Sequence, residues 1–172
     1  MKRIISLTVM NRPGVLNRIT NLFSKRNYNI ESISVGHTEQ ENISRITCAV
    51  NVENDGIIEQ VTKQLNKQID VIKVTDITEQ AMVARELALI KVQSLPHTRG
   101  EINSLIEPFR ATVIDVGKDT LVIQITGESD KIEAFIELIR PYGIKDLART
   151  GPTAFPRGTQ RSSSNQKPIS IL

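Results

Sequence analysis

The chain has 172 residues, and its 22 Lys and Arg residues against 19 Asp and Glu residues give a formal net charge of +3. The excess comes from Arg157, Arg161 and Lys167, because residues 151–172 contain no acid, so the neutral remainder gives no sign of a nucleic-acid-binding face. With 39% hydrophobic residues and one cysteine, Cys48, the composition is that of a globular protein and excludes an intrachain disulfide or a multi-thiolate metal site.

The first 77 residues predict one βαββαβ unit. Residues 2–10 alternate between apolar and polar side chains, with Ile5, Leu7 and Val9 on one face, which predicts a strand with two unlike faces. Helical spacing follows in an apolar stripe made of Val15, Leu16, Ile19, Leu22 and Phe23. The further predicted elements are strands at 30–37 and 43–52 around a turn at 38–42, a helix capped by Asn54, and a strand at 71–77.

The second half repeats this order. The predicted elements are a strand at 83–92, a helix ended by Pro108, strands at 111–116 and 121–126, a helix ended by Pro141 and Gly143, and a strand at 144–150. Thr98 and Glu101 have the spacing of a capping box at the start of the first of these helices. The halves share little residue identity, so the repeat is one of architecture.

This order predicts an α+β fold with two consecutive ferredoxin-like βαββαβ domains, over residues 1–78 and 79–159. Each antiparallel sheet would have helices on one face only, so the other domain or a second chain is expected to cover the open face. Residues 151–172 are rich in Ser, Pro, Gly, Gln and Arg and are expected to be mobile, with 160–172 as a flexible basic tail.

A membrane segment and a signal peptide are not expected. No apolar run approaches the roughly 20 residues of a membrane helix. Lys2 and Arg3 make a basic start, but the polar residues Ser6, Thr8 and Asn11 interrupt the apolar residues after them, as in a strand. We expect a cytoplasmic protein.

Two binding functions of this fold lack the residues they need. RNA readers stack bases on aromatic side chains of the central strands, and residues 4–10 and 43–52 contain none. Metal carriers need clustered thiols or histidines. His37 and His97 lie in different halves, and we expect the former at the end of a surface strand and the latter in the loop before a helix.

Catalysis by this chain alone is not expected. Cys48 lies within a strand on its apolar face, as a buried small residue does, and the chain has no glycine-rich phosphate loop. The carboxylates are scattered among Lys and Arg, as on solvated helix faces, so no nucleophile or acid pair stands out.

The loop Asn11-Arg12-Pro13-Gly14, with Val15 and Leu16 after it, fits two interpretations equally well. In the structural one, Asn11 caps the helix, Pro13 suits its first turn and Gly14 bends the chain. In the other, free N–H groups at the helix start bind a carboxylate, Gly14 allows close approach, and Asn11 offers a donor and an acceptor to an amino acid.

Several segments resemble a known family. Asn11–Ile19 and Phe23–Ser32 resemble the start of an ACT domain, more narrowly that of the regulatory small subunit of acetohydroxyacid synthase, also called acetolactate synthase. Arg85–Val92, Glu128–Ile132 and Gly143–Gly151 resemble the C-terminal domain of that family. The resemblance covers about residues 1–160 and implies an N-terminal ACT domain followed by a C-terminal ACT-like domain.

The resemblance implies a regulatory subunit without catalysis of its own and without a bound cofactor or metal. Such a chain binds the catalytic large subunit, activates it and confers feedback inhibition by valine in branched-chain amino-acid biosynthesis. The partner is expected to use thiamine diphosphate, Mg²⁺ and FAD to condense pyruvate with pyruvate or 2-oxobutyrate. The resemblance also implies a homodimer formed through the ACT domains, with neither nucleic acid nor membrane as a partner.

The family's valine site lies between two ACT domains. Carried over, it comprises Asn11, Gly14, Val15 and Leu16 of one chain and Asn29 and Ile30 of the other. Helix-start amides and Asn11 would hold the carboxylate, Asn29 would accept from the ammonium group, and Leu16 and Ile30 would enclose the isopropyl group. The residues alone also fit a plain helix end at Asn29 and a core strand position at Ile30.

The sequence leaves open the preference among valine, leucine and isoleucine, the choice between dimer and tetramer, the surface that contacts the partner, and any nucleotide effector. Two rival classes also stay open: a free-standing amino-acid sensor for another enzyme, and a small enzyme. A transcriptional regulator would need a helix-turn-helix, for which we find no spare segment.

Overall fold

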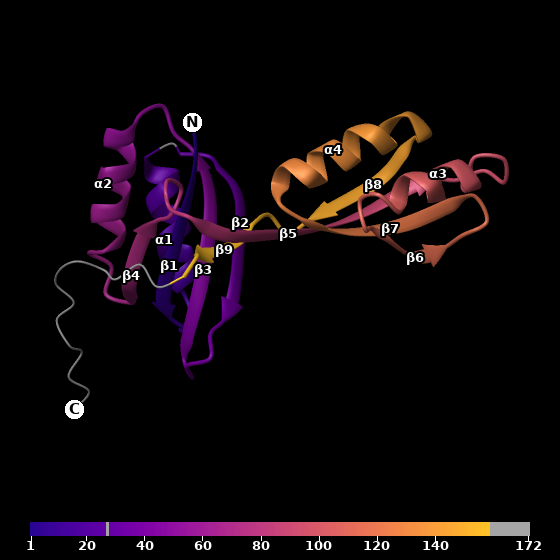
Figure 1. Ribbon diagram of the computed structural model, residues 1–172. Coiled ribbons are helices and arrows are strands. Elements are labelled where there is room, and N and C mark those ends of the chain that lie inside the picture. The colour runs from indigo at the N-terminus through magenta and orange to yellow at the C-terminus, as the bar shows by residue number, and fades with distance from the viewer. Residues whose placement is uncertain (27, 159–172) are drawn as a thin grey trace.

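The computed structural model describes residues 1–26 and 28–158. These residues form two sheets, each with two α-helices, and Figure 1 shows the sheets side by side along the molecule. The first sheet has the strand order β2-β3-β1-β4, so β2 and β4 are its edges. In chain order, the four strands of this sheet and its two helices are β1 (Lys2–Met10), α1 (Val15–Lys25), β2 (Ile30–His37), β3 (Ile43–Asn51), α2 (Asp55–Leu65) and β4 (Val71–Asp76).

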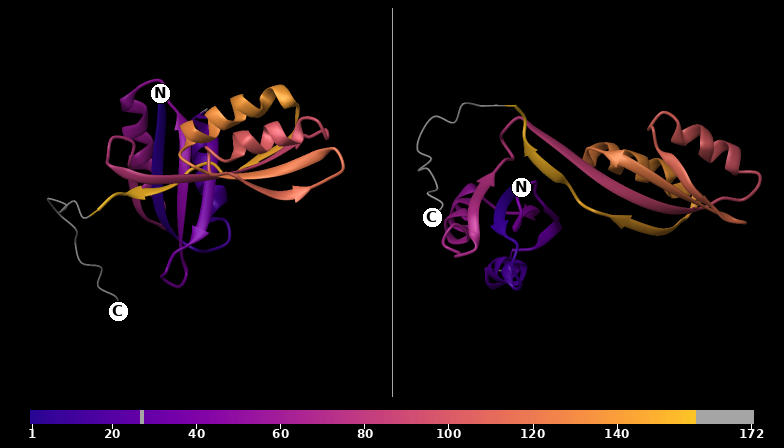
Figure 2. Two further views of the ribbon diagram at one scale, coloured as in Figure 1. Left: turned by 45° about the vertical axis from the view of Figure 1, so that its right-hand side comes forward. Right: turned by 90° about the horizontal axis from the view of Figure 1, so that it is seen from below.

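The second sheet repeats this arrangement with the order β6-β7-β5-β8, and Figure 2 shows its helices on one side of it. Its elements are β5 (Met82–Gln93), α3 (Arg99–Ile106), β6 (Thr112–Val116), β7 (Thr120–Gly127), α4 (Ser129–Ile139), the 3-10 turn η1 (Arg140–Tyr142), β8 (Ile144–Arg149) and β9 (Thr153–Pro156). The predicted α+β fold with two βαββαβ units is confirmed, and the order of the predicted elements matches.

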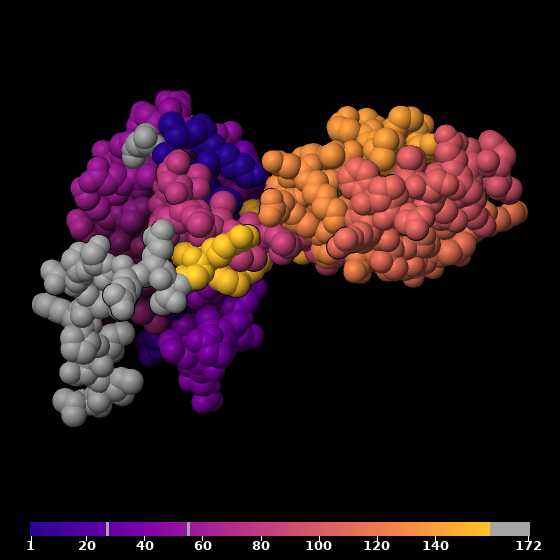
Figure 3. Space-filling view, viewed as in Figure 1, coloured from indigo at the N-terminus to yellow at the C-terminus, as the bar shows by residue number. Residues whose placement is uncertain are grey.

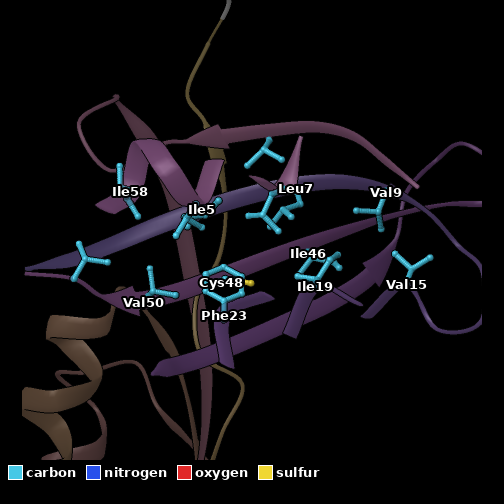
Figure 4. Packing of buried hydrophobic residues seen from close by; sticks show 14 residues of the cluster. Ile5, Leu7, Val9, Val15, Ile19, Phe23, Ile46, Cys48, Val50 and Ile58 are labelled. Atoms are coloured by element: carbon cyan, nitrogen blue, oxygen red, sulfur yellow. The ribbon is translucent and has the colours of Figure 1, made fainter. Parts of the chain in front are cut away.

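Alternation along β1 builds the first core. Ile5, Leu7 and Val9 are at most 2% exposed and face the helices, whereas the residues between them face the opposite side of the sheet. Val15, Ile19 and Phe23 of α1 pack against this face, and Figure 4 shows Cys48 among these side chains. Leu16 of the predicted apolar stripe is instead 43% exposed, because the stripe is wider than the surface that the sheet covers.

The second core follows the same design. Ala88, Ile90 and Val92 of β5 alternate into it, and the Phe109 and Phe135 rings lie with centroids 5.1 Å apart. Such a ring pair contributes about 0.5–1.5 kcal/mol to stability beyond the contribution from burying the two rings.

β5 is longer than predicted and joins the two sheets. Its first residues, Met82–Arg85, pair with β9, and the resulting two-stranded ribbon crosses the face of the first sheet opposite its helices (Figures 1 and 3). Thr47 and Ala49 of β3 point to that face and are at most 2% exposed. The ribbon therefore covers the middle of the face that the sequence left open.

β9 corrects the prediction that the chain is mobile from Gly151 onward. Gly151 turns the backbone at φ 70°, after which Thr153–Pro156 form strand and Ala154 is fully buried. The composition of this segment is typical of a tail, but four backbone pairings with β5 hold it. The expected basic tail at 160–172 lies outside the described residues.

The two predicted helix caps have different outcomes. The Asn54 side chain accepts a hydrogen bond from the Ile57 amide at 3.2 Å, so this N-cap is confirmed. The capping box at Thr98 and Glu101 is wrong. Thr98 has helical dihedral angles, and its hydroxyl donates to the Leu95 carbonyl at 3.1 Å instead of accepting from the helix start.

Candidate functional site

The loop between β1 and α1 lies beside the hairpin that joins β2 and β3. The Asn11 amide donates to the Asn42 carbonyl at 2.7 Å, and Nδ2 of Asn11 lies 3.4 Å from Nδ1 of His37, the last residue of β2. The Asn11 side chain is exposed. The loop, one end of β2 and the β2–β3 turn thus form one surface.

Gly14 is the N-cap of α1. Its φ of 83° and ψ of −7° are left-handed, a conformation that a residue with a side chain adopts at a cost. No side chain of residues 1–26 and 28–158 caps the helix, so the prediction that Asn11 caps it is wrong, whereas the predicted bend at Gly14 is confirmed. The Val15 amide donates to the Arg12 carbonyl at 3.3 Å, which leaves the Leu16 and Asn17 amides of the first turn to water or to a ligand. The helix dipole favours an anion there.

An ion-pair cluster that we did not predict fixes the loop against the sheet. Asp70 is 6% exposed, accepts from Nη2 of Arg18, and has Oδ1 3.7 Å from Nη1 of Arg12. Its carbonyl accepts from the Met10 amide at 2.8 Å. The sequence does show that Arg18 lies one helical turn after Gly14, and therefore close to the start of α1. It does not show the partner of Arg18, because Asp70 is distant in sequence and reaches this place through the pairing of β1 with β4.

Val15 and Leu16 differ in what they can offer a ligand. The Val15 side chain is 4% exposed and belongs to the core, so only its backbone can meet a ligand. The Leu16 side chain, 43% exposed, lies on the surface in the first turn of α1.

Asn29 and Ile30 lie at the other end of α1. Asn29 is exposed just before β2, and Ile30 is partly buried against the first core. Both line an open hollow of about 490 Å³ together with Thr20, Phe23, Ser24 and Tyr28. β2 has eight residues, so roughly 23 Å of strand separates Ile30 from His37. One chain therefore brings Asn11, Gly14 and Leu16 together, and Asn29 and Ile30 together, but not the two groups.

The side chains considered for other chemistry lie apart. Cys48 is fully buried, as predicted, and its burial raises the pKa of the thiol to about 12. His37 ends β2 at the surface and His97 lies in the loop before α3, both as predicted. Among the described residues, no three His, Cys, Asp or Glu side chains come close enough to hold a metal ion.

Two further pKa shifts belong to structural contacts of the second half. Arg149 donates to Glu86, which is 3% exposed, and this hydrogen bond raises the pKa of the guanidinium. A hydrogen bond with Glu101 raises the pKa of Tyr142. Neither group lies in the loop between β1 and α1.

No helix among the described residues has the length and apolar character needed to cross a bilayer.

Comparison with known proteins relates both halves to one kind of protein. Residues 5–73 match the profile of an "AHAS small subunit-like ACT domain", and residues 85–158 match that of the "Small subunit of acetolactate synthase". The chain is 69% identical over 172 residues to the acetolactate synthase small subunit of Bacillus subtilis (strain 168), with all of both chains covered. It is 51% identical over 161 residues to a probable acetolactate synthase small subunit of Archaeoglobus fulgidus, covering 94% of this chain and 100% of the relative.

A solved structure is similar as well. The crystal structure of the acetolactate synthase small subunit from Thermotoga maritima has a TM-score of 0.83 and 40% sequence identity, and the match covers 92% of this chain and 99% of that chain.

Proposed function

Because this chain belongs to the family of acetolactate synthase small subunits, we propose that it activates a catalytic large subunit and makes that subunit sensitive to inhibition by valine. This chain would have no catalysis of its own. The partner would use thiamine diphosphate, Mg²⁺ and FAD for the condensation of 2-oxo acids in branched-chain amino-acid biosynthesis, in the cytoplasm.

The observation that carries the ligand part of the proposal is the uncapped start of α1 behind a left-handed glycine. The Leu16 and Asn17 amides and the exposed Asn11 amide group lie at the surface beside Gly14, where Nη1 of Arg18 is 3.2 Å from the place of a Cβ. Arg12 and Arg18 both pair with Asp70 near the helix start. Because two cations face one carboxylate, the surroundings of the helix start keep a positive charge. A carboxylate fits this place by both hydrogen bonding and charge.

The edge position of β2 supports a site completed by a second chain. An edge strand offers unpaired N–H and C=O groups to another copy of itself. If two β2 strands pair antiparallel about an axis at Ser34, Ile33 of one chain lies opposite Val35 of the other. Because the register of β2 shifts between Ile30 and Ser32, Ile30 then lies opposite His37. Because His37 adjoins Asn11, this register would bring Asn29 and Ile30 of one chain to the loop of the other.

Exposed apolar side chains on the helix side of this edge favour the same pairing. Val35 is 48% exposed although it lies directly opposite the buried Ile46, and Leu16 is 43% exposed. A second chain at the edge would cover both. In the resulting site the Leu16 and Asn17 amides, with the Val15 backbone beside them, and Asn11 bind the valine carboxylate. Asn29 accepts from the ammonium group, and Leu16 and Ile30 contact the isopropyl group.

The test is an activity assay of the large subunit from the same organism, alone and with this chain, over a range of valine concentrations. We expect this chain to raise the activity of the large subunit. We expect valine to lower the activity of the mixture but not that of the large subunit alone. Calorimetric binding of valine without activation would replace this function with that of an amino-acid sensor for another enzyme. Absence of both effects, with an active large subunit, would contradict the proposal.

A further inference from the structure

The face of the first sheet opposite the helices carries two rows of polar side chains beside the ribbon. Cross-strand partners share a face of a sheet, so the pairings of β1 with β3 and β4, and of β2 with β3, define each row. One row consists of Lys73, Thr8, Arg45 and Gly36. The next row consists of Thr75, Ser6, Thr47 and Ser34. The rows thus contain two cations and five hydroxyl groups and no carboxylate.

A hollow of about 330 Å³ opens over the β2–β3 part of these rows. Arg45 and Thr47 line it from β3, Thr153 closes it from β9, and the residues from Ser34 to Glu39 line it from β2 and its turn. Gly36, directly opposite Arg45, leaves open space where a side chain would stand, since a Cβ built there meets no atom within 4 Å. This volume is in the range of small-molecule sites.

The guanidinium of Arg45 is the unusual group in this hollow. Its Nε is buried and has no hydrogen-bond partner among residues 1–26 and 28–158, and no described carboxylate pairs with the side chain. Buried polar atoms are rarely left without a partner, because the lost hydration is uncompensated. The Glu39 carboxylate lines the same hollow from the exposed β2–β3 turn, without an ion pair to Arg45.

We propose that this hollow, here called the Arg45 hollow, binds a small oxyanion: the phosphate or carboxylate group of a metabolite. The planar guanidinium matches two oxygens of either group. The Thr47 hydroxyl, and whichever of the Ser34 and Thr153 hydroxyls accepts the hydrogen bond between them, can donate to the others. The site lies on the opposite face of the sheet from the helices and differs from the proposed valine site. Because Ser34 and Thr153 share a 2.8 Å hydrogen bond at its margin, an anion here contacts both β2 and the ribbon.

The test is an NMR titration of the full chain at constant ionic strength with inorganic phosphate, and separately with propionate, following the Gly36 and Thr47 amides. We expect saturable shifts with at least one of the two anions in the millimolar range. The anion that produces them identifies the chemical source. Arg45→Gln should weaken that binding about tenfold or more, since the charged fork is lost. Arg45→Lys keeps the charge but not the fork and should lie in between.

Arg140→Gln is the matched control, because Arg140 is an exposed arginine of the second half that pairs with Glu137. It should leave the titration unchanged, and thermal melting of each variant checks that the fold persists. Equal binding by the wild type and Arg45→Gln would overturn the proposal, and so would absence of saturable shifts with either anion. It would also be overturned if Arg45→Gln dissociated the oligomer, since Arg45 would then serve a contact between chains.

Discussion

The hydroxyl groups of Ser34 and Thr153, 119 positions apart in the chain, lie 2.8 Å apart and share a hydrogen bond. Ser34 belongs to the edge strand β2, and Thr153 belongs to β9, which pairs with β5. Gly151 adds a second contact, because a side chain there would overlap Ser32 of the same edge strand. The strand that begins at the proposed valine site is thus attached to the ribbon that leads into the second sheet.

Substitutions at this attachment should loosen the two halves from each other. Thr153→Val removes the hydrogen bond at nearly constant volume and should lower the free energy of unfolding by about 0.5–1.5 kcal/mol. Gly151→Ala should cost more, because it combines strain at φ 70° with overlap on Ser32. Urea unfolding measures both effects.

Ser32→Gly provides the internal control for Gly151→Ala. In the double variant the overlap disappears while the backbone strain remains, so part of the stability should return. Additive losses in the double variant would show that Gly151 and Ser32 do not press on each other.

Gly14→Asp should abolish valine inhibition while activation of the large subunit persists. The substitution places a negative charge where the valine carboxylate is proposed to bind, and a left-handed residue costs roughly 1–2 kcal/mol. The new carboxylate would also lie near Arg18 and compete with Asp70 for it, since a Cβ at position 14 is 3.2 Å from Arg18 Nη1. The measurement is the valine concentration for half inhibition of the reconstituted enzyme.

Gly14→Asn separates charge from backbone strain, because asparagine tolerates the left-handed conformation and is neutral. It should shift half inhibition less than Gly14→Asp does. Normal inhibition of the Gly14→Asp enzyme would contradict the placement of the ligand at this helix start. Asn29→His, at the opposite end of β2, should also weaken inhibition by altering the ammonium contact.

Val35→Asp should weaken self-association and the valine response together. The 48% exposed Val35 side chain lies on the free edge strand, where the proposed pairing would bury it. A carboxylate buried there without a partner should raise the dissociation constant of the dimer about tenfold or more. Sedimentation equilibrium with and without valine measures the change.

Ile69→Asp is the matched control, since Ile69 is 94% exposed and lies outside β2. It should leave self-association unchanged. If the two substitutions had the same effect, β2 would not be the dimer edge.

The Cys48 thiol should be unreactive in the folded chain. Its titration should also make the free energy of unfolding depend on pH in the alkaline range. Burial raises the pKa of its thiol from 9.0 to about 12, so the folded state keeps the proton that the unfolded state loses. Between pH 9 and pH 12 the free energy of unfolding should therefore fall, by up to about 1.4 kcal/mol per pH unit from this group. Cys48→Ala should show a shallower decline in urea unfolding measured across this range.

Thiol labelling gives an independent check. A thiol reagent should react with Cys48 slowly in the native protein at mildly alkaline pH and rapidly in denaturant. Rapid labelling of the native chain would show that the sulfur is accessible, contrary to its full burial.

Periodicity was sufficient for most of the fold, because it records which face of each element is buried. The alternation of Ile5, Leu7 and Val9 predicted β1, and Asn54 predicted the start of α2, since both signals act between residues close in sequence. The capping box predicted at Thr98 was wrong because the Thr98 hydroxyl donates to the Leu95 carbonyl, an acceptor that the capping-box spacing does not consider.

Local sequence patterns were enough to predict the two βαββαβ units, the family resemblance and the loop from Asn11 to Leu16 as a candidate binding site. Three features became visible only in the folded chain: Gly14 starts α1 without a side-chain cap, Asp70 pairs with Arg18, and β9 crosses the first sheet to reach Ser34. The last two of these features join residues 52 and 119 positions apart. Local propensity contains no information about such pairs, because backbone pairing and burial select them only after the sheets have formed.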